Sequence, residues 1–252
     1  MEEKVTESKF KFPTEVVELP SKGLIYPKDN PLSSGKLEMK YMTAKEEDIL
    51  TNANYLQKGI VLDKLLESLI VSKINYNDLI TGDKNALLIA ARVLGYGKEY
   101  SFDVNGENQT IDLTELEDKE LDPKHLIKPN HNEFAFTLPI IKKEITFKFL
   151  THSDERKIDE ELKGLKKMKQ EAGELTTRLK YMILSLDGDY ERKTVRNFVD
   201  NQLLARDSRA LREYVRQIQP DVNMTFDYEN ENGEMQRGAN VPLNINFFWP
   251  DV

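Results

Sequence analysis

Over positions 36–42 the apolar residues Leu37, Met39 and Tyr41 alternate with the polar residues Lys36, Glu38 and Lys40. This period of two is typical of a strand with one buried face. Thr43 follows directly, with Glu46 three positions later, and that spacing predicts a capping box at the start of a helix over about 44–52. The pattern therefore opens with a strand that leads into a capped helix.

Two further helices and a hairpin are expected to follow. Residues 60–72 carry a wide apolar face at helical spacing. Asp83 can cap a third helix over about 84–94. Asn105 and Gly106 then form the strongest short hairpin signal that a sequence can carry. The strands of this hairpin are expected over 100–104 and 110–113.

A polar segment over 115–132, which contains two prolines, separates this pattern from a second one. The second pattern repeats the capping signal, because strand-like residues lead into Thr151 and Asp154 follows three positions later. Its remaining elements are expected as a hairpin over 134–138 and 144–150, helices over about 152–169, 174–186, 192–204 and 208–217, and a last hairpin over about 224–228 and 240–248 around Asn232 and Gly233.

The two patterns also match in residue type. Block 37–50 aligns with block 145–158, and block 83–104 aligns with block 207–228 without a gap. Any junction of strand, threonine and helix looks similar for physical reasons, but two matching blocks in one order favour an internal duplication. The identical pairs include Lys40 with Lys148, Thr43 with Thr151, Glu47 with Glu155, Asp83 with Asp207, Ala86 with Ala210, Leu87 with Leu211, Arg92 with Arg216, Phe102 with Phe226 and Asp103 with Asp227.

The predicted fold class is therefore α+β and helix-dominated, with two tandem related units of strand, helices and β-hairpin. Two copies are too few for a solenoid, so the units are expected to pack on each other as a pseudo-symmetric pair. The expected division is residues 1–33 as an N-terminal arm and proline-rich loop, 34–117 as the first unit, 118–132 as a linker and 133–252 as the second unit.

Composition excludes several classes of site. The chain of 252 residues has no cysteine and three histidines, which excludes disulfides, thiolate zinc sites and histidine-rich metal sites. A net charge of −8 disfavours a dedicated nucleic-acid binder. No apolar run approaches the ~20 residues that cross a bilayer, and the first residues lack the apolar stretch of a secretory signal. A soluble protein without membrane contact is expected.

No catalytic, cofactor-binding or metal-binding motif is present. Gly95, Tyr96 and Gly97 follow a predicted helix instead of a strand, so they are expected to form a helix end and not a phosphate loop. The Asp187-Gly188-Asp189 turn resembles part of a calcium loop, but the remaining ligands are missing. The sequence predicts a protein that is not an enzyme and has no cofactor.

Three segments are candidate partner-binding surfaces. The loop over 20–27 either packs on the body or awaits a partner. Four arginines spaced three or four apart form either a solvated face paired with acids or a surface for an acidic protein or phosphates. The aromatic end either closes the core or anchors a partner. The candidate residues are Pro20, Leu24 and Tyr26 in the loop, Arg206, Arg209, Arg212 and Arg216 in the arginine stripe, and Phe247, Phe248 and Trp249 at the aromatic end.

Several segments taken together resemble a known family. The segments are ELPSKGLIYP at 18–27, LEMKYMTAKEEDIL at 37–50, GDKNALLIAARVLGYG at 82–97, ELKGLKK at 161–167, LLARDSRALREYVR at 203–216 and FFWP at 247–250. As a set they resemble the baseplate hub subunits and hub assembly chaperones of T-even-type contractile-tail bacteriophages. Some members of that family carry Cys-x-x-Cys pairs in their hairpins. The turns at 105–108 and 230–233 hold none, so these hairpins are expected to form without zinc.

The resemblance implies a non-enzymatic, virus-encoded protein that assembles the tail baseplate hub in the host bacterial cytoplasm. Its partners would be other hub proteins, and no small-molecule substrate is implied. One alternative is a permanent structural subunit of the hub, which would place the protein in the virion. Another is a regulatory nucleic-acid-binding protein that uses the arginine stripe. The oligomeric state is left open, and the second unit is expected to carry the binding surface.

Overall fold

The computed structural model describes residues 13–169, 171, 173–230, 232–243 and 245–248. Over these residues the chain is α+β, as predicted, with eight α-helices and several small antiparallel sheets. The expected arm lies largely in residues 1–12, which are outside the described residues. Within the described chain, no helix combines the length and the apolarity needed to cross a membrane.

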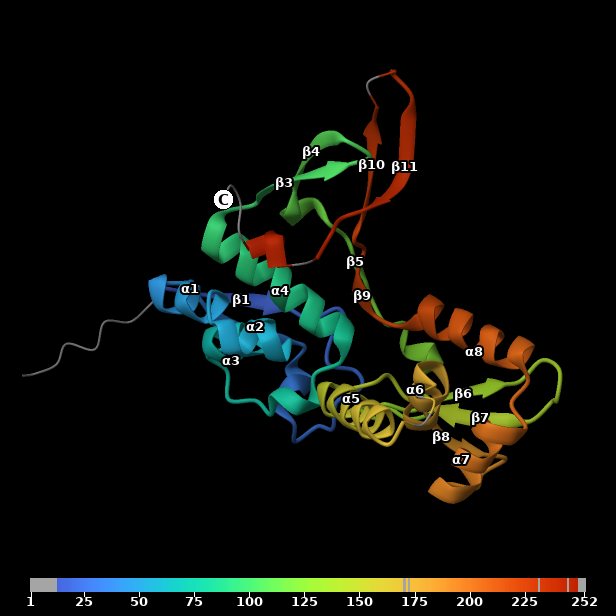
Figure 1. Ribbon diagram of the computed structural model, residues 1–252. Coiled ribbons are helices and arrows are strands. Elements are labelled where there is room, and N and C mark those ends of the chain that lie inside the picture. The colour runs from blue at the N-terminus through green and yellow to red at the C-terminus, as the bar shows by residue number, and fades with distance from the viewer. Residues whose placement is uncertain (1–12, 170, 172, 231, 244, 249–252) are drawn as a thin grey trace, which may run out of the picture.

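The first body starts with a hairpin that the sequence did not predict. Strand β1 (Thr14–Glu18), inside the segment expected as arm and loop, pairs antiparallel with β2 (Lys36–Lys40), which is the strand predicted over 36–42. After β2 the chain enters four helices (Figure 1). These are α1 (Ala44–Leu50), α2 (Ala53–Lys58), α3 (Val61–Leu69) and α4 (Thr81–Tyr96).

The second body repeats this order around a three-stranded antiparallel sheet. Strand β6 (Phe134–Thr137) pairs with β7 (Glu144–Phe147), which confirms the expected hairpin. The helices that follow are α5 (His152–Lys167), α6 (Glu174–Met182), α7 (Arg192–Asn201) and α8 (Ala205–Ile218). In Figure 1, α8 lies along one side of the sheet formed by β6, β7 and β8 (Ile183–Leu186).

The helix predicted over 174–186 is wrong at its C-terminal end. Helix α6 stops at Met182, and Ile183–Leu186 forms strand β8, which pairs with β7. The apolar run suits either structure locally. The open edge of β7 decides between them, and Ser185 Oγ lies 2.8 Å from Thr146 Oγ1 across the two strands. Pairing with a distant strand has overridden the helical spacing.

Both capping boxes are confirmed, and both have an additional lysine. The Thr43 N–H donates to Glu46 at 3.0 Å, and the Lys40 ammonium lies 2.8 Å from the same carboxylate. In the second body the Thr151 N–H donates to Asp154 at 3.0 Å. Lys148 occupies the position that Lys40 has in the first body, 2.7 Å from the Asp154 carboxylate. The two strand-to-helix junctions therefore have the same interactions.

The expected capping role of Asp83 is wrong, because α4 begins two residues earlier, at Thr81. Asp83 lies in the first helical turn with no exposed surface. Its carboxylate accepts hydrogen bonds from the Ser21 N–H at 3.0 Å, the Ser21 hydroxyl at 2.7 Å and the Tyr26 hydroxyl at 2.6 Å. The loop between β1 and β2 is thereby held against the start of α4.

Asp207 plays the same part in the second body. It lies in the first turn of α8, is fully buried and accepts hydrogen bonds from the backbone N–H groups of Ile140 at 2.7 Å and Ile141 at 3.4 Å. Ile140 and Ile141 belong to the loop between β6 and β7, which corresponds to the β1–β2 loop. In each body, a buried aspartate joins the hairpin loop to the last helix.

Two hairpins pack together away from the helices (Figure 1). Strand β3 (Glu99–Val104) and β4 (Glu107–Asp112) flank Asn105 and Gly106, both of which have positive φ, as this turn requires. Strands β10 (Thr225–Glu229) and β11 (Met235–Asn240) form the other hairpin. The Phe102 and Phe226 rings meet edge to face, with centroids 5.3 Å apart. The second body thus contributes a hairpin that packs on the first.

The second arm of the last hairpin was predicted in the wrong place, over 240–248, whereas β11 spans Met235–Asn240. Strand β11 ends at Asn240, and Pro242 follows it, which cannot donate to a ladder. Residues Ile245–Phe248 form a 3₁₀ turn that packs against α4. Phe247 lies edge to face on Tyr100, with ring centroids 4.8 Å apart.

The polar segment after β4 is ordered by the second body. Strand β5 (Asp118–Lys119) pairs antiparallel with β9 (Asp221–Val222), the segment that follows α8. Strand β9 also packs on α4. Gly82 of α4 lies so close to this segment that a Cβ atom there would come within 1.9 Å of the Pro220 carbonyl oxygen. The two bodies are therefore connected by packed structure as well as by the chain.

We predict that Asp83→Ala and Asp207→Ala each lower the free energy of unfolding by about 3 kcal/mol, because each removes a buried carboxylate and leaves the donors packed against it without an acceptor. Urea denaturation would measure the change. Asp48→Ala is the matched control, since Asp48 is exposed on α1, and it should cost less than about 0.5 kcal/mol. Equal effects at Asp48 and Asp83 would contradict this role for the buried carboxylates.

Asp83 also predicts a pH dependence. Burial raises its pKa from 3.8 to about 6, against the opposing effect of its hydrogen-bond donors. The folded state therefore holds the Asp83 proton more tightly than the unfolded state, so this group stabilises the fold at low pH and loses that effect as pH rises through about 6. We expect the stability advantage of the wild type over Asp83→Asn to shrink between pH 4.5 and 7.5. Urea denaturation across that range tests this, and an advantage that grows with pH would contradict it.

Candidate functional site

Helix α8 has one buried face and one charged face. Leu211, Val215 and Ile218 pack into the core. The four arginines of the predicted stripe all lie on the exposed face of the helix. These residues are Arg206, Arg209, Arg212 and Arg216. The structure therefore brings the stripe together as the sequence predicted.

Contacts along its length hold α8 in place. Asp207 ties its first turn to the β6–β7 loop. At mid-helix the half-buried Tyr214 ring stacks on Phe136, with centroids 5.0 Å apart, and its hydroxyl lies 3.2 Å from His125 Nδ1. Near its end, the Lys119 ammonium of β5 donates to the Arg216 carbonyl. The arginine face is therefore carried by a well-anchored helix.

The face keeps most of its positive charge. Arg209 lies 2.8 Å from Glu213, and this pairing lowers the Glu213 pKa, but both side chains are so exposed that solvent screens the pair. Arg212 Nε donates to the Ser208 carbonyl at 3.3 Å. Within the described residues, Arg206, Arg212 and Arg216 form no ion pair. Arg196 does not extend the stripe, because Glu161 of α5 neutralises it at 2.9 Å.

The loop candidates lie in a different place. Pro20 and Tyr26 are buried and Leu24 is half-buried. The Tyr26 hydroxyl is held by Asp83, and desolvation raises the Tyr26 pKa. Of the two readings of this loop, the structure has the one in which it packs on the body. Pro20 and Tyr26 offer no surface to a partner in this conformation.

The aromatic end also contributes to the core. Phe247 and Phe248 have no exposed surface, and their rings meet edge to face with centroids 5.3 Å apart. Trp249 lies outside the described residues. The expected strand geometry, with apolar side chains on both faces, is absent at Phe247 and Phe248, because the chain turns there as a 3₁₀ helix under α4.

Sequence reasoning missed the apolar side chains beside the arginines. Leu204, directly before α8, is 44% exposed, and Ile140 is 39% exposed. The hydrogen bond from the Ile140 N–H to Asp207 places that loop next to the first turn of α8. The Leu203-Leu204 pair in front of a helix start was a usable signal, but helical spacing placed it inside the preceding helix.

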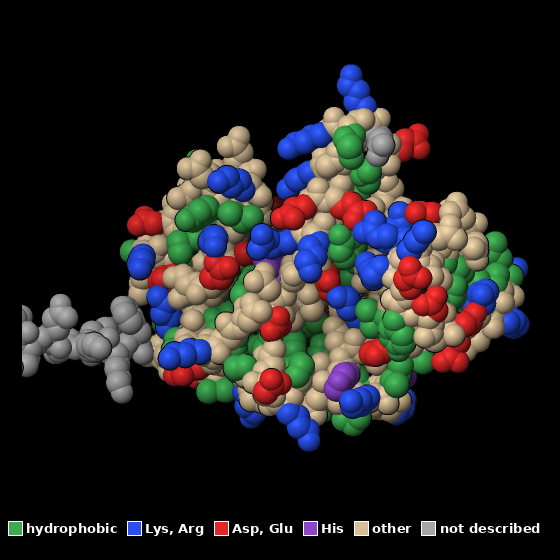
Figure 2. All heavy atoms as spheres, turned by 90° about the horizontal axis from the view of Figure 1, so that it is seen from below, with side chains coloured by type: hydrophobic (Ala, Val, Ile, Leu, Met, Phe, Trp, Pro, Cys, Tyr) green, Lys and Arg blue, Asp and Glu red, His purple; other side chains and the backbone are tan. Residues whose placement is uncertain are grey.

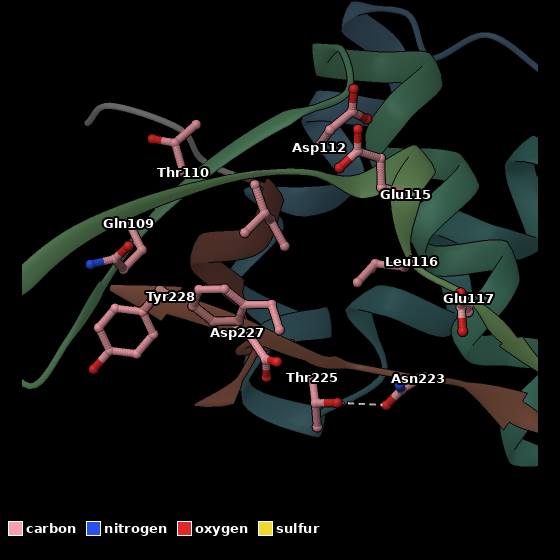
Figure 3. Close-up of a pocket in the computed structure, with 12 residues that line it drawn as sticks. Gln109, Thr110, Asp112, Glu115, Leu116, Glu117, Asn223, Thr225, Asp227 and Tyr228 are labelled. Carbon is pink, nitrogen blue, oxygen red and sulfur yellow. Dashed lines mark hydrogen bonds between the residues drawn. The ribbon is translucent and has the colours of Figure 1, made fainter. Parts of the chain in front are cut away.

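A cleft of about 510 Å³ lies between β4 and β10 (Figure 3). Its lining includes Asp112, Glu115, Glu117 and Asp227. Asp112 is already paired with Lys98 at 2.6 Å and accepts from Thr114, which lowers its pKa to about 2. In the described part of the chain, no three histidine or carboxylate side chains are grouped so that they could hold a metal. Among the described residues, the cleft therefore has no grouping of side chains that could hold a metal.

The aspartate turn that resembled a calcium loop has structural contacts. The Asp187 carboxylate lies 2.8 Å from the Lys143 ammonium and accepts from the Glu144 N–H at 3.0 Å. Asp189 accepts from the Glu191 N–H at 2.8 Å. The Asp187 contacts tie the turn to the start of β7, and the Asp189 contact lies just before α7.

Figure 2 shows one face of the molecule, on which cations and anions are mixed. Comparison with family models, with curated proteins and with solved structures gave no match for this chain. The function therefore has to be argued from the surface itself, and the exposed arginine face of α8 is the best-defined candidate.

Proposed function

We propose that this chain is a non-enzymatic assembly protein of a contractile-tail baseplate hub, and that it holds hub proteins through the arginine face of α8. The observation that carries the proposal is a helix fixed by burial on one side that presents Arg206, Arg212 and Arg216 without ion pairs in the described structure. Arginine binds carboxylates through two hydrogen bonds at once, which suits an acidic protein surface. The segment-level resemblance supplies the identity of the partner.

The same face is poorly suited to nucleic acid. Single-stranded nucleic acid is bound by stacking bases on exposed aromatic side chains. The aromatic residues nearest the stripe are Tyr214, which stacks on Phe136, and Phe198, which is 1% exposed. Neither offers an open ring face for a base. The net charge of −8 also opposes a phosphate backbone away from α8.

An assembly factor and a permanent hub subunit would use this face in the same way. They differ in what remains in the finished particle. We propose the assembly role, in which the chain holds hub components in an assembly-competent arrangement and leaves. Presence in purified virions at a fixed stoichiometry would instead identify a permanent subunit.

Removal of residues 151–252 is unsuited to testing which unit binds. Strand β9 pairs with β5 and packs on α4, so that deletion would strip a packing partner from the first body. Point substitutions on exposed residues separate binding from folding.

We predict that Arg206→Glu/Arg212→Glu/Arg216→Glu reduces capture of baseplate hub proteins at least roughly tenfold, because the contact relies on cations that face acidic groups. The measurement is a pull-down from infected cells with the full chain as bait, with virion proteins quantified by mass spectrometry after nuclease treatment. Lys28→Glu/Lys58→Glu/Lys73→Glu is the matched control, because these lysines are exposed on the first body and the net charge changes equally.

The control variant should capture hub proteins as the wild type does. Equal loss in both triple variants would show that net charge alone is responsible and would contradict a site on α8. Capture that disappears on nuclease treatment would favour the nucleic-acid alternative.

A further inference from the structure

The two bodies meet at a short backbone contact within the chain. The Leu79 carbonyl, just before α4, accepts a hydrogen bond from the His152 N–H at 2.8 Å. Ile80 pairs with Thr151 in an isolated antiparallel bridge. Leu79 and Ile80 have no exposed surface as a result. The segment before the last helix of the first body thus docks on the residues that start α5.

Polar side chains surround this contact. The Lys84 ammonium lies 2.7 Å from Asp63 and 3.2 Å from His152 Nδ1. The Tyr76 hydroxyl donates to Asp63 at 2.8 Å, and its ring meets the His152 ring edge to face. Backbone pairing, ring packing and charge together make this a built interface.

Each side of this interface has a counterpart in the other body. Leu203 and Leu204 precede Asp207 by the same spacing as Leu79 and Ile80 precede Asp83. Both aspartates are buried in the first turn of their helix and hold the loop of the preceding hairpin. The second body therefore carries the same docking segment as the first.

The receiving side is duplicated as well. Thr43 and Ala44 occupy the positions of Thr151 and His152, each directly after a strand and within a capping box that includes a lysine. The first body therefore carries the same receiving backbone as the second.

Neither counterpart is used within the chain. Leu204 is 44% exposed, where Ile80 is 0% exposed, and Ala44 is exposed. Among the described residues, no hydrogen bond is formed by the Leu203 carbonyl or by the Ala44 N–H. Both surfaces stay open in one chain and are therefore available to a second chain.

The exposed acids of α1 are complementary to the arginines of α8, although the exposed Lys45 lies between these acids and Ala44. Arg206, Arg209 and Arg212 lie on the exposed face of α8, just after Leu204. Glu47 and Asp48 are exposed on α1, just after Ala44. Complementary charges favour this pairing over a contact between two copies of the same surface.

We propose that Leu203 and Leu204 of one chain dock on Thr43 and Ala44 of a second copy, and so repeat between chains the contact that Leu79 and Ile80 make within one. The Leu203 carbonyl accepts from the Ala44 N–H, and the α8 arginines face the acids of α1. Such a contact joins different surfaces of the two chains, so it is head-to-tail and can close into a ring or extend. The identity of the hub partner does not enter this contact, although both contacts use the arginine face of α8, so self-association is measured on the purified chain alone.

Sedimentation velocity of the purified full chain over a range of concentrations tests this. The wild type should self-associate, and Leu204→Asp should weaken association at least roughly tenfold, because it places a charge in the apolar contact. Ala44→Pro should do the same. It removes only the donor N–H, since proline suits the first position of a helix and Thr43 already has the extended backbone that a following proline requires.

Leu175→Asp is the matched control, because Leu175 is also 44% exposed, on α6. It should leave association unchanged. Circular dichroism and thermal melting check that each variant is folded.

A mixture of the two disrupted variants is diagnostic. The Leu204→Asp chain keeps an intact receiving surface, and the Ala44→Pro chain keeps an intact docking segment. Together they should form a 1:1 heterodimer of wild-type affinity that grows no further. A wild type that stays monomeric at every concentration, or association that survives both substitutions, would overturn the proposal. A mixture that fails to pair would also overturn it.

Discussion

The structure depends on a carboxylate buried in the first turn of a helix without a cation beside it. Asp83 is fully buried, and it is held by the Ser21 N–H and by the hydroxyls of Ser21 and Tyr26. A buried charge is tolerated only when its acceptor capacity is satisfied, so the donors must stay in place. This requirement fixes the β1–β2 loop against α4. Helix α4 in turn supports β9 and the 3₁₀ turn that contains Phe247 and Phe248. Disturbing one carboxylate would therefore loosen both bodies.

In the second body, the corresponding buried carboxylate, Asp207, fixes a helix whose outer face is exposed, whereas Asp83 fixes a helix that is packed on by other segments. Asp207 holds the β6–β7 loop against α8, but no later segment of the described chain covers the outer side of that helix to the extent that β9 and the 3₁₀ turn cover α4. The arginines can stay exposed because Leu211, Val215 and Ile218 supply the burial that keeps the helix folded. One local design thus gives a central packed helix in one body and an exposed cationic helix in the other.

The sequence predicted features whose physics is local. The capping boxes at Thr43 and Thr151 need only three residues of spacing, and the turn at Asn105 and Gly106 needs only two positive φ angles. The arginine stripe was predicted for the same reason, since helical spacing alone puts its members on one face. The α+β class and the order of most helices follow from such signals.

Features set by distant partners were not predictable in this way. The sequence pattern suggested that Asp83 caps a helix. Its carboxylate instead accepts from residues 62 and 57 positions away, which local spacing does not reveal. The Ile183–Leu186 run reads equally well as helix, and only the open edge of β7 makes it a strand. Whether Tyr26 and Phe247 were core or contact residues depended on what covered them, which a single sequence does not record. Local spacing predicts secondary structure, whereas the burial of a residue depends on which distant segments pack on it.

The difference between the bodies has one structural origin. The chain that leaves α8 does not fold back over its own body but crosses to the first as β9, β10 and the 3₁₀ turn. That crossing buries α4, and the α5 start buries Leu79 and Ile80. It also leaves Leu204, at the start of α8, exposed in the described part of the chain. The docking segment is covered in the first body at Leu79 and Ile80, but the corresponding segment of the second body leaves Leu204 exposed and the Leu203 carbonyl without a hydrogen bond among the described residues. A surface of that kind is complementary to the end of the molecule that carries the matching strand-to-helix junction, and that junction is exposed at Ala44.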